Sequence, residues 1–350
     1  MLHFKRLPVL LLALVVLTVL IVACGPAATP VPTAAPVVQT VVVPQTVVVA
    51  QTVVVPTATA VPATATPVPP TPVAKVADDA VGQKGKLAIC VDFPYPPQEF
   101  FDEQGNPVGS DVEIGGEIAK RLGLKVQYVN SVFDTIIAAV KAGKCDIIIS
   151  AQNITDERKK AVSMIPYFKA GQGMLAQKGN PQKVKTPLDL CGLSAAAESG
   201  TTEADYLAGT GDYDPVKGTA DSKGKGLTQQ CVKAGKAAPK VVVTQKDTDA
   251  LQQLQAGKVA VYMADSPVVA YYVVKQPDLF EVVGDVVEPA LEGISVPCDK
   301  DDCTKAALSP LADAVKTALK SMIADGAYGK ILDKWKLTGG ALTAANVDGK

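Results

Sequence analysis

Short β-branched strands alternate with amphipathic helices through most of this chain, and that order constrains its fold more than any other feature. The first series predicts strands at 86–92, 126–130 and 145–150, with helices at about 111–122 and 133–142 between them. Strands and helices that alternate at this spacing form right-handed βαβ units in a parallel sheet. We therefore expect an α/β fold.

A second series follows the same plan. It predicts strands near 192–198, 240–244 and 259–264, and helices after Thr202, over 248–256 and after Ser266. In each series a helix ends in an Ala-Gly-Lys corner before a buried strand, at 142–144 and again at 256–258. Glycine is the usual residue beyond the last helical turn at such corners. The repetition predicts two lobes.

The C-terminal part of the chain is expected to return to the first lobe. It predicts a strand over 293–296 and amphipathic helices over 310–324 and 328–336. Two crossings between the lobes, near Lys169 and Glu292, would form a hinge. The expected division is lobe 1 over 85–169 and 293–340, lobe 2 over 170–292, and a loose tail over 341–350.

The N-terminus predicts export. Lys5 and Arg6 precede an apolar stretch that ends in Ile-Val-Ala before Cys24, which is typical of a lipoprotein signal peptide over 1–23. Lipid on Cys24 would anchor the chain to the outer face of the cell membrane, on the periplasmic side if an outer membrane is present. An uncleaved anchor helix is the alternative. Residues 24–84, rich in Pro, Thr and Val, would form a disordered tether.

Charge and histidine content exclude several classes of protein. The chain has 34 Lys and Arg against 35 Asp and Glu, so no basic field favours nucleic acid. The only histidine, His3, lies in the predicted signal, which removes histidine-based triads and zinc sites from the mature chain. We expect no cofactor, no metal site, no nucleic-acid partner and a monomer.

Six cysteines follow Cys24, and export favours disulfides over metal ligation. Cys90 and Cys145 fall in different predicted strands, at different distances from the strand ends, so we expect buried thiols there. We expect two disulfides, within the pairs Cys298–Cys303 and Cys191–Cys231.

Arg158 is expected at a position where a positive charge is unfavourable. Thr155 is expected to cap a helix, and Arg158 in the first turn of that helix opposes the helix dipole unless an anion lies in front of it. A ligand carboxylate would supply that anion. The alternative is a surface arginine that pairs with Asp156 or Glu157.

Other polar residues follow the carboxyl ends of the strands, where open α/β sheets bind ligands. The carboxylate of an amino acid could be bound by Arg158, Thr201 and Thr202. Its ammonium group could be bound by Asp265, Asn153 and backbone carbonyls near Ser150 and Ala151. Alternatively, Thr201 and Thr202 belong to a plain N-cap turn and Asp265 caps a helix. Tyr95 and Phe133 could line the cleft, although Phe133 could also be core.

An ordered series of motifs over about 86–337 resembles the family 3 extracellular solute-binding proteins, the amino-acid-binding receptors of ABC importers. The motifs are Asp92 to Phe100, Asp102 to Asp111, Phe133 to Lys144, Ile154 to Arg158, Gly200 to Thr202, Asp265 to Tyr271 and Ala324 to Trp335. The resemblance implies a two-lobed periplasmic-binding-protein fold of type II, in which each lobe is a mostly parallel sheet flanked by helices.

The resemblance also implies roles for individual residues. Arg158 would grip the ligand carboxylate, Asp265 would hold the α-ammonium, Tyr95 and Phe133 would pack on the ligand side chain, and Asp92 would meet its polar end. Polar and main-chain contacts would come from Ser150, Ala151, Asn153, Thr201 and Thr202.

The chain departs from the family pattern at three positions. Phenylalanine is usual where Gln98 and Ser110 stand, and a threonine or serine is common at Asn153. We interpret Gln98 and Ser110 as surface changes or as changes behind the ligand site.

The expected function is therefore a receptor without catalytic residues, which delivers an amino acid to the permease of an ABC transporter. Asp92 favours a polar or cationic ligand side chain. A cyclohexadienyl dehydratase-like enzyme and a sensing module for a partner receptor are the alternatives, and Asp265 favours binding over elimination.

Overall fold

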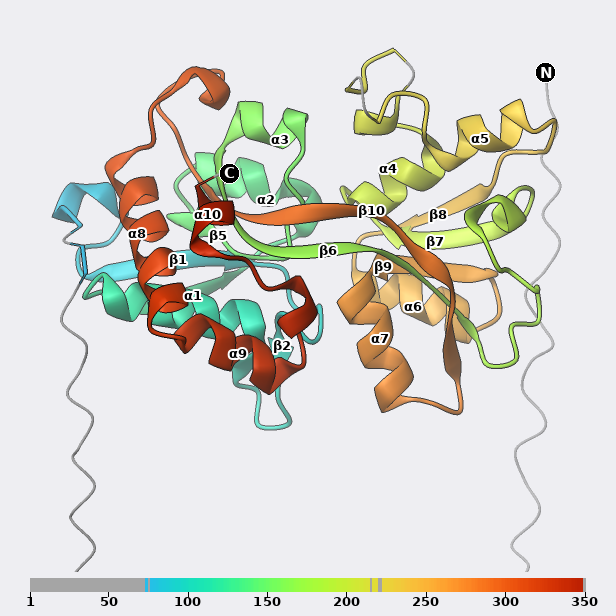
Figure 1. Ribbon diagram of the computed structural model, residues 1–350, viewed down its shortest axis with the longest axis horizontal. Helices are drawn as coiled ribbons and strands as arrows, with labels where there is room; N and C mark the ends of the chain where they lie inside the picture. The colour runs from blue at the N-terminus through green and yellow to red at the C-terminus, as the bar shows by residue number, and fades with distance from the viewer. Residues whose placement is uncertain (1–72, 75, 215, 220–221, 349–350) are drawn as a thin grey trace, which may run out of the picture. The chain divides into compact units, whose positions relative to one another are not determined.

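The computed structural model describes residues 73–74, 76–214, 216–219 and 222–348 (Figure 1). Their strands form an eight-stranded sheet in the order β4-β1-β5-β10-β6-β9-β7-β8 and a two-stranded sheet of β2 and β3. The predicted signal peptide, Cys24 and the tether up to residue 72 lie outside this part of the chain. None of the helices in these ranges is long and apolar enough to cross a membrane.

Lobe 1 contains the parallel strands of the first series, because β1 pairs with both β4 and β5. Its helices cover both faces of this half of the sheet, and the core on one face joins α1, α8 and α9. Its elements are β1 (Lys86–Val91), β2 (Phe100–Phe101), β3 (Pro107–Val108), α1 (Ser110–Arg121), β4 (Lys125–Asn130), α2 (Ile136–Lys141), β5 (Ile147–Ile148), α3 (Asp156–Ala161), α8 (Pro310–Ala324), α9 (Ala327–Trp335) and α10 (Ala344–Val347).

Lobe 2 contains the second series, with β7 parallel to both β8 and β9. Two clusters of buried side chains, one on each face of the sheet, form its core. Its elements are β7 (Ser194–Glu198), α4 (Thr202–Ala208), α5 (Leu227–Lys233), β8 (Lys240–Thr244), α6 (Asp247–Gln255), β9 (Val261–Asp265) and α7 (Ser266–Lys275). The predicted helix corners are present in both lobes, since Gly143 and Gly257 take positive φ values of 72° and 67°.

Two long antiparallel strands, β6 (Ser163–Gln177) and β10 (Phe280–Val296), cross side by side from one lobe to the other (Figure 1). Leu291 pairs with Lys169 in this ladder, so the two predicted crossings are neighbours. The predicted strand over 293–296 is only the last part of β10. Its length was not predictable from helix–strand alternation, because β6 and β10 lie outside that pattern.

The ends of the described chain are more ordered than predicted. The tail is not loose, because Val347 of α10 is 2% exposed in the lobe 1 core and Asp348 pairs with Lys316 and Lys320. The tether boundary at residue 84 is also wrong. Gly82 donates its backbone N–H to Asp146 Oδ1 (2.6 Å), so this segment is fixed to lobe 1.

All three pairs of described cysteines are disulfides. Cys191–Cys231 and Cys298–Cys303 form as predicted. The expectation of buried thiols at Cys90 and Cys145 is wrong, because these residues are bonded with their Cα atoms 5.6 Å apart. Cys145 precedes β5, which begins at Ile147, so a comparison of positions along two strands did not apply to it.

Candidate ligand-binding site

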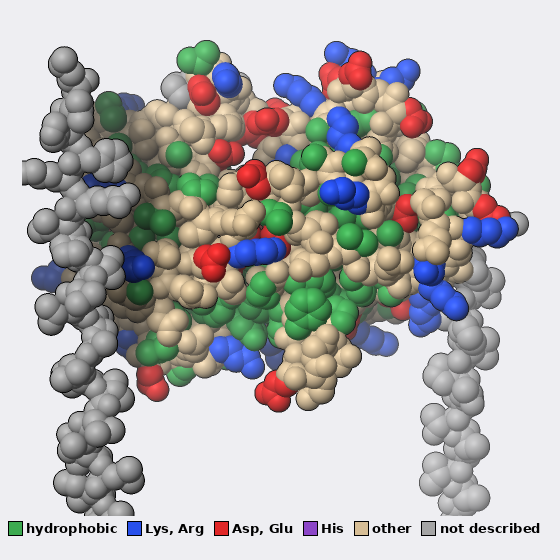
Figure 2. All heavy atoms as spheres, turned by 180° about the vertical axis from the view of Figure 1, so that it is seen from behind, with side chains coloured by type: hydrophobic (Ala, Val, Ile, Leu, Met, Phe, Trp, Pro, Cys, Tyr) green, Lys and Arg blue, Asp and Glu red, His purple; other side chains and the backbone are tan. Residues whose placement is uncertain are grey.

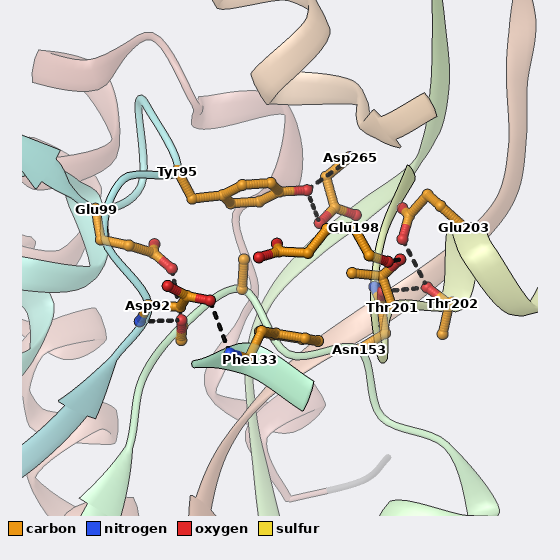
Figure 3. A pocket seen from close by; sticks show the side chains of 12 residues that line it. Asp92, Tyr95, Glu99, Phe133, Asn153, Glu198, Thr201, Thr202, Glu203 and Asp265 are labelled. Atoms are coloured by element: carbon orange, nitrogen blue, oxygen red, sulfur yellow. Dashed lines mark hydrogen bonds between the residues drawn. The ribbon is translucent and has the colours of Figure 1, made fainter. Parts of the chain in front are cut away.

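The strand ends of the two lobes meet around one small cavity (Figure 3). The space that the centre of a water molecule can reach there is only about 10 Å³. The lining residues are Asp92, Tyr95, Glu99, Phe133, Ser150, Ala151, Asn153, Glu198, Thr201, Thr202, Glu203 and Asp265. Nine of the ten residues predicted from the sequence are among them, and Arg158 is not.

Asp92 is held at the end of β1 by contacts from both lobes. Phe133 donates its backbone N–H to Asp92 Oδ2 (2.7 Å), and Ser150 Oγ accepts the backbone N–H of Asp92 (3.0 Å). Lys246, from lobe 2, donates its ammonium group to Asp92 Oδ1 and to the Phe93 carbonyl. The charge of Asp92 is therefore balanced within the protein.

Asp265 lies at the end of β9 and meets lobe 1 through Tyr95. The Tyr95 hydroxyl donates to Asp265 Oδ2 (2.9 Å) and accepts the backbone N–H of Asp265 (2.9 Å). Asp265 occupies the N-cap position before α7, as the alternative role predicted, but its side chain makes no capping hydrogen bond. Burial, and next the nearby Glu203, raise the pKa of Asp265 well above its usual value, although hydrogen bonding from Tyr95 opposes the shift.

Arg158 lies in the first turn of α3, as predicted, and Thr155 Oγ1 accepts its backbone N–H (3.2 Å). Its guanidinium donates through Nη1 to the Asn153 carbonyl and through Nη2 to the Gly200 carbonyl, both at 2.8 Å. It also stacks 5.3 Å from the centre of the Phe133 ring. Burial lowers the pKa of Arg158, and Glu203 opposes that shift. Arg158 thus connects the two lobes beside the cavity.

The threonines after β7 have different partners. Thr201 caps α4, since its Oγ1 accepts the backbone N–H of Ala204 (3.2 Å), as the alternative to a ligand role predicted. Thr202 instead donates its hydroxyl to Asn153 Oδ1 (2.6 Å), another contact between the lobes. Phe133 is partly exposed and belongs to none of the core clusters among the described residues, so the core alternative for it is wrong.

Sequence reasoning missed three acidic residues that line the cavity: Glu99, Glu198 and Glu203. Burial, and then the nearby Asp247 and Asp92, raise the pKa of Glu198 to about 10. Burial also raises the pKa values of Glu99 and Glu203. Glu198 is the last residue of β7, so the rule on strand ends could have identified it. Glu99 and Glu203 lie in a turn and a helix, where no local pattern marks them.

The residues that depart from the family pattern are interior. Gln98 is 1% exposed and donates to Glu292 Oε2 (2.7 Å), while Ser110 is 2% exposed. Of the two interpretations, surface changes are wrong for both residues, and changes behind the ligand site remain a prediction. Within the described ranges, no cluster of His, Cys, Asp and Glu is arranged to hold a metal ion.

The fold and cavity define a class: a two-lobed binding protein with its site between the lobes. The model of the family "Bacterial extracellular solute-binding proteins, family 3" matches residues 87–338, and the chain belongs to this family.

On the face seen in Figure 2, basic and acidic side chains are interspersed, which agrees with the near-zero net charge.

Two curated relatives are similar along most of the chain. The arginine-binding protein ArgT of Corynebacterium glutamicum is 27% identical over 283 residues, which cover 81% of this chain and 84% of that protein. The L-cystine-binding protein TcyJ of Escherichia coli K12 is 25% identical over 264 residues, covering 73% and 84%. These relatives therefore bind different amino acids.

Two solved structures extend the comparison. An ancestral arginine-binding protein bound to arginine is 31% identical, has a TM-score of 0.60, and is matched over 72% of this chain and 98% of that chain. The ancestral amino acid-binding protein AncCDT-1, described as a precursor of cyclohexadienyl dehydratase, is 30% identical, with a TM-score of 0.56 and coverage of 72% and 95%.

Proposed function

We propose that this protein captures an amino acid with a polar or cationic side chain outside the cytoplasm and delivers it to the permease of an ABC transporter. The observation that carries the proposal is the set of acidic residues that both lobes direct into one cavity: Asp92 and Glu99 from lobe 1, and Glu198, Glu203 and Asp265 from lobe 2. Buried carboxyl groups favour a ligand with cationic groups, because a nearby cation lowers their raised pKa values and compensates the charge that they then carry.

Capture requires the lobes to separate, because the centre of a water molecule can reach only about 10 Å³ of the cavity, which is room for about one water molecule and not for an amino acid. Contacts between the lobes would then close around the ligand. Asn153 with Thr202 and Tyr95 with Asp265 supply such contacts on opposite sides of the cavity. A ligand that touches both lobes favours the closed state by its higher affinity for that state.

The location and attachment of the protein are part of this proposal. The signal-like segment before Cys24 supports export and a lipid anchor on that cysteine. Mass spectrometry of the membrane-bound protein would test this, because a diacylglycerol-modified Cys24 at the N-terminus is the expected product. An N-terminal fragment that retains residues 1–23 would contradict it.

A thermal-shift screen with the common amino acids tests the ligand class. A ligand at 100 times its Kd stabilises the protein by about 2.7 kcal/mol. We expect the largest shifts with arginine, lysine, ornithine and glutamine. If none of the amino acids shifts the transition, the proposed function is wrong.

A second candidate function is a dehydratase, and one observation favours it. Glu198 has a pKa of about 10 and so keeps a proton that an elimination reaction could use. Phenylpyruvate formation from prephenate, followed by absorbance, would support this function. We expect no turnover, because the role that we propose for Asp265, which lines the cavity, is to hold the ligand amine.

A further inference from the structure

A group of buried carboxyl side chains lies behind the cavity, where the hinge strand β10 enters lobe 1. It consists of Glu99, Asp111 and Glu292, each 1% exposed or less. The Tyr167 hydroxyl of β6 lies 2.5 Å from Asp111 Oδ2 and 3.2 Å from Glu292 Oε2, so it joins two of them. In the described part of the chain, no lysine or arginine forms an ion pair with any of the three. Burial without a counter-ion favours the neutral form of a carboxyl group.

Gln98 contacts Glu292 in an arrangement that an ionised carboxylate leaves incomplete. Gln98 Nε2 donates to Glu292 Oε2 (2.7 Å). The other oxygen of each side chain, Gln98 Oε1 and Glu292 Oε1, is buried and has no hydrogen-bond partner among the described residues. Both oxygens are acceptors while Glu292 is ionised, so they cannot bond to each other. A proton on Glu292 Oε1 makes it a donor, and an acid and an amide can then form two parallel hydrogen bonds.

The surroundings of Glu292 favour this proton. Burial first, and then the charges of Asp265 and Asp111, raise the pKa of Glu292 well above its usual value, while hydrogen bonds from Gln98 and Tyr167 oppose the shift. The pKa of Asp111 is about 6, so Asp111 is ionised at pH 7. A second charge on Glu292 would lie near that of Asp111 in a buried site, which costs free energy. The proton on Glu292 avoids this cost.

Glu292 is linked to two lobe 1 segments that line the cavity. Its backbone forms an isolated β-bridge with Asn153. Its side chain bonds to Gln98, which belongs to a tight turn, because the Tyr95 carbonyl accepts the backbone N–H of Gln98 (3.1 Å). Tyr95 and Asn153 both line the cavity (Figure 3), and each makes a side-chain hydrogen bond to lobe 2. The hinge strand is thus connected to the lobe 1 residues that meet lobe 2 across the cavity.

We propose that Gln98 and Glu292 are positioning residues for ligand binding, in which a protonated Glu292 and the Gln98 amide form a paired contact that fixes the Tyr95 turn to β10. The pair sets the geometry in which Tyr95 meets Asp265 when the lobes close. The phenylalanine that is usual in the family at position 98 has no group that could form this pair. This inference rests on the proposed function, and neither residue of the pair lines the cavity.

The proton is tested by thermal denaturation of the ligand-free full chain between about pH 5.5 and pH 8. A glutamate in the unfolded chain loses its proton near pH 4.3, so a proton kept by folded Glu292 makes stability fall as the pH rises, by up to about 10-fold in the folding equilibrium constant per pH unit. Glu292→Gln keeps both hydrogen bonds without a titrating group, so its slope should be shallower. The exposed Glu103→Gln is the matched control and should keep the wild-type slope. Equal slopes for wild type and Glu292→Gln would overturn the inference.

The positioning role is tested by calorimetric titration of the full chain with L-arginine at pH 7. Gln98→Leu breaks the pair, and we expect affinity to fall about 10-fold or more, whereas the exposed Gln104→Leu should change it less than about threefold. The double variant Gln98→Glu with Glu292→Gln exchanges the acid and the amide. It should restore affinity to within about threefold of wild type, which a loss of packing alone would not explain.

The outcomes separate this inference from the proposed function. Unchanged affinity in Gln98→Leu, or a double variant that binds as weakly as Gln98→Leu, would overturn the positioning role and leave the proposed function standing. Failure of the proposed function is detected separately, when the wild-type protein binds no amino acid in the thermal-shift screen, and that result would overturn the positioning role as well.

Discussion

The two ends of the cavity balance their negative charge in different ways. At one end, Asp92 is paired with Lys246, a cation that the other lobe provides. At the other end, Asp265 receives a hydrogen bond from the neutral Tyr95 and lies near Glu203, and its pKa is strongly raised. Asp92 thus has a counter-ion from the protein, whereas Asp265 has none and is expected to bind either a proton or a ligand cation. The two aspartates therefore differ in how their charge is balanced.

The largest effect is expected at Arg158, which lies beside the second end and links the lobes. Arg158→Ala removes two charge-assisted hydrogen bonds, to the Asn153 and Gly200 carbonyls, so we expect ligand affinity to fall about 100-fold or more. Calorimetry measures the affinity, and the thermal transition should change little because no core is opened. Lys160→Ala, an exposed change on the same helix, is the control. Affinity retained within about threefold would remove Arg158 from the site.

Asp265→Asn tests the end without a counter-ion. The change keeps the shape and removes the charge, so loss of one charge-assisted hydrogen bond to a ligand ammonium should cost about 1.5 to 3 kcal/mol, or roughly 10- to 150-fold in affinity. The exposed Asp249→Asn is the matched control. An unchanged affinity would mean that the ligand amine is held elsewhere.

Lys246→Met tests the end with a built-in counter-ion and should act in the opposite direction. Removing the ammonium leaves Asp92 without its partner, so a cationic ligand should bind about 10-fold more tightly, while the ligand-free protein becomes less stable. Titration and thermal denaturation together measure both effects. Lys240→Met, at an exposed position on β8, should change neither. Weaker binding would show that Lys246 supports the ligand site instead of competing for Asp92.

The smallest effect is expected in the pH dependence of stability. Burial raises the pKa of Asp247 to about 7 and that of Asp111 to about 6, while both would titrate near 3.9 in the unfolded chain. Between about pH 4 and 7 the folded state therefore binds more protons than the unfolded state, so stability falls as the pH rises. We expect the midpoint of thermal unfolding to fall by roughly 2–4 °C for each kcal/mol lost.

Asp247→Asn is the control for this pH dependence, because it removes one of the two titrating groups and should flatten the slope. A ligand-free midpoint that rises steadily from about pH 4 to 7 would contradict the assignment of protons to these buried carboxyl groups.

The local parts of the fold were predictable because they depend on short-range patterns. The helix corners at Gly143 and Gly257, the Thr155 cap and the alternation of strands and helices follow from periodicity and capping. Strand ends in a parallel sheet meet at one edge, so the positions of Asp92 and Asp265 along the chain were enough to predict that both line one cavity.

The sequence alone therefore determined the two-lobed plan and most of the residues around the cavity, since hydrophobic periodicity and strand ends are local properties. Only the tertiary structure decided the charge balance of the site. The pairing of Lys246 with Asp92 joins residues 154 positions apart, and the Tyr95 contact to Asp265 spans 170 positions. Likewise, the disulfide between Cys90 and Cys145 forms because β1 and β5 are neighbours in the sheet. Such contacts depend on how the lobes and strands pack, and no short stretch of sequence contains that information.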